Sequence, residues 1–313
     1  MSCIVSNQKS IESVNAGTAF RFAYSRAKIW KSWIWGITFF FAVLQTGASI
    51  FIFYNKTPSF DPTPYVVFFL ILSVIVGSFG KSQVLEWQSM GCTIQRLHDF
   101  LVMGIGVQPT HIELPRAKVI EFSQKWLEKE PNDAKVFEEW WNTSLNKVPF
   151  PVAKVIATYS TFSWENELRK KYQTILIALI TFSLFGPLSL SILLEYTVSQ
   201  AIIFVYAPLT PFISVILDEL LSNKQSLKVS ESLNIECHST WANITMGKLT
   251  SSEIEKATER HMYFWQNFRQ SATPIFDWFY LRSQRKMEKN MIVNTDELIG
   301  VYLDSLHTGK ACL

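Results

Sequence analysis

The chain has 313 residues, of which 48% are hydrophobic, 14% aromatic and only 18% charged, whereas soluble domains carry roughly 25% charged residues. Its formal net charge of +3 lacks the strong basic excess of a nucleic-acid-binding domain, so we expect neither DNA nor RNA as a partner. Cys3, Cys92, Cys237 and Cys312 have neither zinc-site nor disulfide-framework spacing, so no metal is expected. The eleven Trp residues favour lipid–water interfaces, and the composition is typical of a membrane protein.

Residues 1–32 form a polar segment that turns basic and aromatic towards its end. The apolar stretch that follows starts too late for a secretory signal peptide, and no small-residue cleavage site comes after it. We predict a first transmembrane hairpin over residues 33–80, with spans at residues 33–54 and 64–80 joined by a short, proline-rich linker.

The longest apolar stretch covers residues 173–217 and contains one formal charge, Glu195, near its middle. A bilayer core takes roughly 20 helical residues, so this stretch predicts two spans, at residues 173–194 and 197–217, with a tight turn between them. Buried helices of soluble proteins seldom stay uncharged over two successive windows of about 20 residues. We expect Glu195 in that turn, in water at the outer surface, because a carboxylate within the bilayer is costly.

Basic residues gather at one end of the predicted spans, whereas the loops within the two hairpins hold only Lys56. The gathered residues are Arg26, Lys28, Lys31, Lys81, Arg169, Lys170, Lys171, Lys224 and Lys228. By the positive-inside rule, both termini and the central segment lie in the cytoplasm. Residues 1–32, 81–172 and 218–313 are therefore predicted to be cytoplasmic.

The central segment, residues 81–172, predicts helices that continue the spans. Apolar residues recur at three- and four-residue spacing from Val84 to Leu101, so the second span should extend as one helix of about 40 residues. Gly104 and Gly106 mark its expected end. A similar stripe over residues 152–172 leads directly into the third span, which favours a second continuous helix.

The C-terminal segment, residues 218–313, also predicts helices. Thr250 and Glu253 form a capping box, Pro274 should end that helix, and another should begin near Asp277. The expected fold class is an all-α membrane protein with four transmembrane helices in two hairpins. A helical cytoplasmic domain would be built from the central and C-terminal segments.

Catalytic motifs are absent from the sequence: it has no Walker loop, GxGxxG, HExxH or GxSxG pattern, and its five His residues are scattered. We therefore expect no enzyme and no cofactor. Within the first span, Gln45, Thr46 and Ser49 share a helical face with Ala42. Such a stripe packs spans together or lines a pore, and packing is the more common role.

Basic and aromatic residues on the cytoplasmic side are the remaining candidates for a ligand site. Arginine forks pair with phosphates and aromatic rings stack on bases, although the same basic residues also suit anionic lipid headgroups. The candidate ligand-binding residues are Arg26, Arg96, Trp164, Arg169, Lys170, Arg269, Tyr280 and Arg285.

Four short segments, in this order around the spans, resemble the SMODS-associated four-transmembrane effectors of bacterial antiphage signalling. They are Tyr24-Ser25-Arg26-Ala27-Lys28; Ile94-Gln95-Arg96-Leu97-His98-Asp99; Trp164-Glu165-Asn166-Glu167-Leu168-Arg169-Lys170-Lys171-Tyr172; and Arg260 and Arg269 followed by Asp277-Trp278-Phe279-Tyr280, Arg285 and Glu288. The chain departs from the family pattern in two places, which cover three residues. Tyr263-Phe264 stand where Gln-Asp is expected, and Arg96 stands where an acidic residue is expected. If these positions touch the ligand, the ligand of this chain differs.

The resemblance implies an effector in the bacterial inner membrane. A cyclic di- or trinucleotide, made by a partner nucleotide cyclase, would activate it. The effector would then oligomerise with copies of itself or open, disrupt the membrane and cause abortive infection.

Two further interpretations remain open from the residues themselves. One is a ligand-independent membrane scaffold that holds a cytoplasmic partner. The other is a constitutive small-ion channel or transporter, for which Pro187, Pro208 and Pro211 could kink the spans. The lack of an evident charge pair within the spans counts against this second interpretation.

Overall fold

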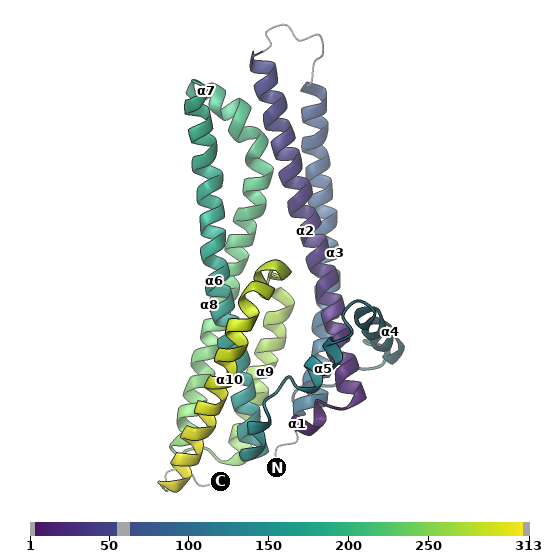
Figure 1. Ribbon diagram of the computed structural model, residues 1–313, viewed down its shortest axis with the longest axis vertical. Coiled ribbons are helices and arrows are strands. Elements are labelled where there is room, and N and C mark those ends of the chain that lie inside the picture. The colour runs from purple at the N-terminus through teal and green to yellow at the C-terminus, as the bar shows by residue number, and fades with distance from the viewer. Residues whose placement is uncertain (1–3, 55–62, 309–313) are drawn as a thin grey trace. The chain divides into compact units, whose positions relative to one another are not determined.

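The computed structural model describes residues 4–54 and 63–308, which form helices and no strand (Figure 1). Within these ranges the side chains of residues 63, 66, 284–286 and 288 are not described. The helices are α1 (Ile4–Asn7), α2 (Ile11–Tyr54), α3 (Thr63–Met103), α4 (Arg116–Leu127), α5 (Asp133–Glu138), the 3₁₀ turn η1 (Thr143–Lys147), α6 (Phe150–Leu193), α7 (Val198–Ala201), the π-helical turn η2 (Ile202–Tyr206), α8 (Ala207–Thr245), α9 (Ser251–Ser271) and α10 (Asp277–His307).

Four of these helical stretches are long and apolar enough to cross a membrane. They cover Ile11–Tyr54, Val67–Met103, Phe150–Leu193 and Val198–Thr245. The prediction of an all-α protein with four spans is therefore confirmed. The predicted extension of the second and third spans into long helices is also confirmed, because α3 has 41 residues and α6 has 44.

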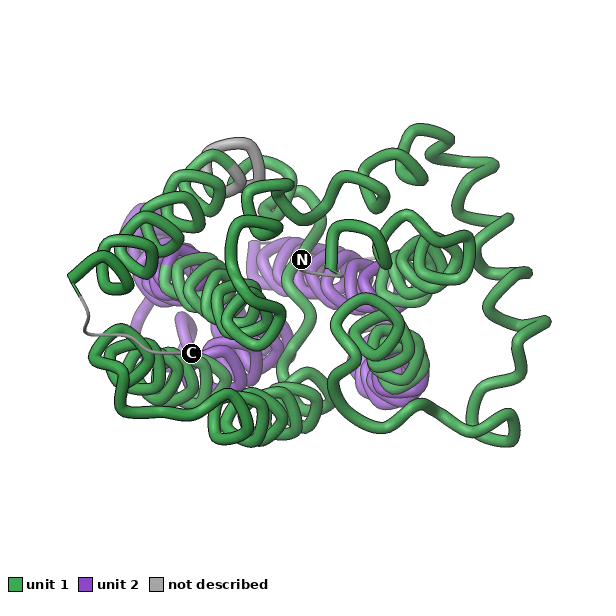
Figure 2. The backbone as a smooth tube through the Cα atoms, turned by 90° about the horizontal axis from the view of Figure 1, so that it is seen from below, with its two compact units in different colours: residues 1–26, 87–170, 225–313 green, residues 27–86, 171–224 purple. Residues whose placement is uncertain are grey.

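The chain forms two compact units, which Figure 2 colours separately. Unit 1 comprises Met1–Arg26, Trp87–Lys170 and Gln225–Leu313, and unit 2 comprises Ala27–Glu86 and Lys171–Lys224. All four predicted spans fall in unit 2. The sequence limits of the membrane segments stay a prediction.

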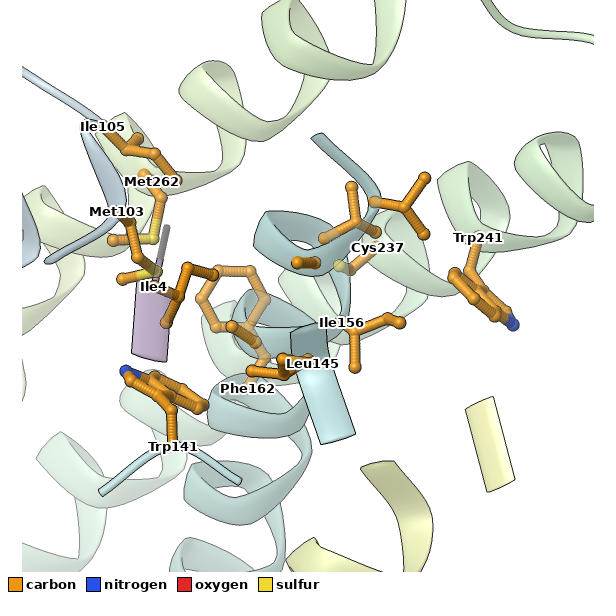
Figure 3. Close-up of a cluster of buried hydrophobic side chains, with 14 of the residues drawn as sticks. Ile4, Met103, Ile105, Trp141, Leu145, Ile156, Phe162, Cys237, Trp241 and Met262 are labelled. Carbon is orange, nitrogen blue, oxygen red and sulfur yellow. The ribbon is translucent and has the colours of Figure 1, made fainter. Parts of the chain in front are cut away.

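The main core of unit 1 surrounds the first half of α6. Ile156 and Phe162 of α6 are completely buried, and Cys237 and Trp241 of α8 and Met262 of α9 belong to the same cluster (Figure 3). Burying a side chain the size of Phe162 contributes about 1.5–3 kcal/mol. The apolar periodicity of residues 152–162 thus serves this core.

A second cluster in unit 1 explains a helix that the sequence analysis did not predict. Residues 1–32 read as a polar segment, yet α2 begins at Ile11. Ala16, Ala19 and Ala23 are completely buried and pack with Ile94 of α3 and Phe122 of α4. These alanines have the spacing of one helix face, and their small size lets large neighbours cover α2 closely.

Unit 2 has the surface of a membrane protein, because it exposes many large apolar side chains and buries several polar ones. Phe40, Val74 and Phe185 are exposed, whereas Gln45 and Ser49 of α2 are buried. This arrangement suits a lipid surround, where helices associate through packing and hydrogen bonds rather than by hiding apolar area.

Gly80 fixes the close approach of α2 and α3. A Cβ atom at Gly80 would lie 2.5 Å from Cγ1 of Ile34, which is closer than real Cβ contacts allow. A larger residue at this position would push the two helices apart.

The turn between the third and fourth spans lies where the sequence predicts it. α6 ends at Leu193 and α7 begins at Val198. Glu195, which is exposed, adopts a left-handed conformation with φ of 54°. Its position in the turn is confirmed, while its contact with water outside the membrane stays a prediction.

Pro187 and Pro211 both lie inside helices, α6 and α8. A π-helical turn, η2, precedes α8, and Tyr206 within it donates a hydrogen bond of 2.8 Å to the carbonyl oxygen of Leu184. Backbone groups within a bilayer need partners from the protein, and side-chain donors can supply them where a helix is irregular.

Candidate ligand-binding site

Arg169 lies in the interior of unit 1, with its side chain 4% exposed. Its Nε is 2.7 Å from Oε1 of Glu165, one turn earlier on α6, and its two terminal nitrogens donate to the carbonyl oxygen of Thr273 at 3.4 and 3.5 Å. The guanidinium also stands 5.1 Å from the centre of the Phe268 ring. Charge pairing and a cation–π contact together fix this arginine.

Arg269 of α9 is held in a similar way. Its Nη1 donates to Oδ2 of Asp99 on α3 at 2.5 Å, and the side chains of the pair are 11% and 6% exposed. The guanidinium lies 5.0 Å from the ring centre of Trp265. Trp265 in turn stacks on Phe268 with their ring centres 5.0 Å apart, so the two arginines flank one aromatic pair.

These contacts bear on the predicted role of the two arginines. A ligand phosphate that displaced Glu165 or Asp99 would leave behind a largely buried carboxylate without its partner. The primary role of Arg169 and Arg269 is therefore to stabilise the packing of unit 1. Their contact with a ligand stays a prediction.

The other candidate cations do not gather at one place. Arg26 is exposed, 5.6 Å from the ring centre of Trp87, and Arg96 pairs with Glu113 at 3.3 Å. Lys170 pairs with Glu231 at 3.1 Å in an exposed contact. Arg285 lies on α10, but its side chain is outside the described residues.

Trp164 and Tyr280 are brought together. Their rings, from α6 and α10, meet edge to face with centres 5.3 Å apart. Trp164 also lines a groove of about 320 Å³ between α6 and α10. The residues that line the groove are Tyr159, Ser160, Ser163, Trp164, Glu167, Met287, Asn290, Met291, Asn294, Glu297, Leu298 and Val301.

The polar residues of this α6–α10 groove differ from those expected of a phosphate site. Asn290, Asn294, Glu167 and Glu297 offer amide and carboxylate groups, and the described lining contains no arginine or lysine. Burial raises the pKa of Tyr159, so its hydroxyl keeps its proton and remains a donor. Aromatic rings with amides and carboxylates suit the faces and edges of a nucleobase better than its phosphates.

Of the residues that line the groove, only Trp164 is among the ligand-binding residues predicted from the sequence. Asn290, Asn294 and Glu297 follow one another at four- and three-residue spacing, which places them on one face of α10. This polar stripe on α10 is visible in the sequence. Its place in a groove becomes evident only when the structure shows that α10 packs beside α6.

The three residues predicted to line a pore or to pack the spans differ in burial within unit 2. Gln45 and Ser49 are buried, whereas Thr46 is half-buried and donates to the carbonyl oxygen of Ala42 at 2.8 Å.

Across the described ranges, no group of three or more His, Cys, Asp or Glu residues has an arrangement that could hold a metal ion.

The architecture is that of a multi-pass, all-α membrane protein, with the predicted spans in unit 2 and further helices in unit 1. Residues 2–298 match the model of a family described as the SMODS-associating 4TM effector domain. The chain belongs to this family and is an effector of SMODS-associated antiphage signalling, as the sequence resemblance predicted. Comparisons with curated proteins and with solved structures gave no match.

Proposed function

We propose that a cyclic di- or trinucleotide binds the α6–α10 groove and switches this effector to a state that disrupts the bacterial inner membrane. Membership of the effector family supports the link to signalling. The groove is the observation that carries the ligand site, because it combines aromatic rings with polar groups that match base edges. The signal would come from a partner nucleotide cyclase, and copies of the chain would assemble or open on activation.

The size and chemistry of the groove define what part of the ligand it takes. A volume of about 320 Å³ is at the small end of ligand pockets, so it suits one base of a cyclic oligonucleotide. Stacking on an aromatic side chain contributes about 1–3 kcal/mol per base. The phosphates would then pair with cations outside the groove. Lys170 is one candidate, since its exposed pair with Glu231 is weak and easily exchanged.

Helix α6 offers a route from ligand to membrane. It carries Trp164 and continues unbroken to Leu193, through the third predicted span. A ligand that prefers one arrangement of α6 and α10 shifts the population of the whole helix towards that arrangement. The same helix therefore takes part in both recognition and response.

The ligand is tested by thermal unfolding of the detergent-purified protein with a panel of cyclic di- and trinucleotides. A ligand at 100 times its dissociation constant stabilises the folded state by about 2.7 kcal/mol, which a melting curve detects readily. We expect one cyclic nucleotide to raise the melting temperature and its linear analogue to have no effect. The Trp164→Ala variant should lose this shift.

Trp278→Ala is the matched control, because Trp278 is an exposed tryptophan of α10 outside the groove lining. It should keep the full shift. An equal shift in wild type and Trp164→Ala would place the ligand elsewhere. If the whole panel leaves the folded protein unshifted, the ligand-independent scaffold becomes the better interpretation.

A further inference from the structure

Helix α8 carries two adjacent acidic residues that receive lysines from both helices of the first hairpin. Nζ of Lys31, on α2, lies 2.5 Å from Oε1 of Glu219. Nζ of Lys81, on α3, lies 2.7 Å from Oδ2 of Asp218. All four residues belong to unit 2.

The two ion pairs differ sharply in burial. The side chains of Lys31 and Glu219 are 5% and 8% exposed, whereas those of Lys81 and Asp218 are 61% and 60% exposed. An exposed pair contributes little, because water already solvates both charges. Removing one partner of a buried pair is strongly unfavourable, because it leaves a charge without compensation in a medium of low polarity.

Tyr172 completes the buried cluster from a third helix. Its hydroxyl, on α6, donates to Oε1 of Glu219 at 2.9 Å, and Nζ of Lys31 lies 5.7 Å from the centre of its ring. Tyr172 itself is 1% exposed. One carboxylate oxygen of Glu219, on α8, therefore contacts residues of α2 and α6. Helix α2 belongs to the first hairpin, whereas α6 and α8 belong to the second.

The cluster lies near one end of the buried face of α2 in unit 2, which carries several polar residues. Lys31, Thr38 and Gln45 follow one another at seven-residue intervals and are all buried. Residues at that spacing share a helix face. In sequence, Lys31 lies two residues before the first predicted span and Tyr172 lies directly before the third. Glu219 lies two residues after the fourth. Separation of α2 from α8 here would uncover the polar face that follows.

We propose that Lys31, Tyr172 and Glu219 form a clamp that holds the two transmembrane hairpins together at rest and opens on activation. This inference rests on the proposed membrane-disrupting function. The buried pair sets a barrier to separation, and its opening presents Thr38, Gln45 and Ser49 to a widening bundle interior. The exposed Lys81–Asp218 pair guides the approach of the hairpins but adds little to the barrier.

Dye release from liposomes that contain the purified protein, without any nucleotide, tests the clamp. Lys31→Met and Glu219→Gln each remove one charge of the buried pair with little change in volume. We expect each variant to increase the population of the open state about tenfold, and the rate of dye release should rise by the same factor over wild type. Lys81→Met, the matched control in the exposed pair, should stay within about twofold. The exchange Lys31→Glu with Glu219→Lys should return release towards the wild-type rate.

Two arms guard against variants that fail to fold. Thermal unfolding in detergent identifies such a variant, and Tyr172→Phe removes only the hydroxyl, so it should fold and still speed release by a smaller factor. Wild-type release in folded Lys31→Met, Glu219→Gln and Tyr172→Phe would overturn the clamp. Wild type is also measured with the cyclic nucleotide panel. If no nucleotide triggers release while the single variants leak, the clamp stands and the proposed ligand is wrong.

Discussion

At the scale of single residues, His98 shows how the interior of unit 1 responds to pH. Its ring packs edge to face against Phe20 and Phe137, with centres 5.5 and 5.6 Å away. Burial lowers the pKa of His98 to about 4, and the neighbouring Asp99 carboxylate only partly opposes this effect. The imidazole is therefore neutral in the folded protein at physiological pH.

We predict that His98 makes the protein acid-sensitive below its unfolded pKa of about 6.5. The folded pKa is lower than the unfolded one, so the unfolded chain binds the proton first and stability falls as pH drops from about 6.5 towards 4. The loss due to His98 at pH 5 should be about 2 kcal/mol relative to pH 8. Chemical unfolding of wild type and His98→Phe at both pH values measures it.

The variant should lose only part of the acid sensitivity. Burial also lowers the pKa of His261, which is 1% exposed. His261 therefore also reduces the stability of the fold as the pH falls. His111→Gln, a change at an exposed histidine of a loop, should behave like wild type. An equal loss of stability in wild type and His98→Phe would contradict the assignment to His98.

At the scale of helices, the side chain of Gln88, on α3, caps the C-terminal end of α9. Its amide Nε2 donates to the carbonyl oxygens of Arg269, Gln270 and Ala272 at 2.8, 3.1 and 2.6 Å. The last carbonyl groups of a helix lack partners within it, and here a side chain from another helix supplies them. At its other end, α9 has the predicted capping box of Thr250 and Glu253.

We predict that Gln88→Met destabilises the protein by about 1–3 kcal/mol, the cost of leaving buried acceptors without donors. The effect should be local first, so amide hydrogen exchange should accelerate in the last turn of α9 more than in its first turn. Gln83→Met, at a position with one exposed contact to Glu86, should stay within about 0.5 kcal/mol of wild type. If amide hydrogen exchange accelerated equally along the whole of α9, the local capping role of Gln88 would be contradicted.

Helix limits were predictable where the signal is local. Gly104 follows the last residue of α3 with φ of 63°, and α10 begins at Asp277 as the sequence predicts. The first half of α2 was not predictable from apolar periodicity, because its buried face is made of alanines. Such a face becomes recognisable only when its large partners are known.

The candidate site shows the same contrast. The Glu165–Arg169 pair spans one helical turn and follows from sequence spacing. Asp99 and Arg269 are 170 residues apart, so no local pattern indicates that they neutralise each other. The sequence marked these arginines as candidates for phosphate, but only the packing of α3 with α9 supplies the competing carboxylate.

At the scale of the whole molecule, the polarity of the four helices and their flanks decides how the chain enters the membrane. An even number of spans places both termini on one side. The loops within the hairpins contain a single basic residue, Lys56, whereas lysines and arginines flank the opposite ends of the spans. The positive-inside rule then predicts cytoplasmic termini.

Fusion reporters in a bacterial host test this orientation. Green fluorescent protein at the C-terminus should fluoresce, and alkaline phosphatase at the same position should be inactive, because it matures only outside the cytoplasm. Alkaline phosphatase inserted within residues 55–62 should be active. The reverse pattern would place the α6–α10 groove outside the cytoplasm. A nucleotide made inside the cell could not reach it there, so an inverted topology would exclude the proposed activation as well as the predicted orientation.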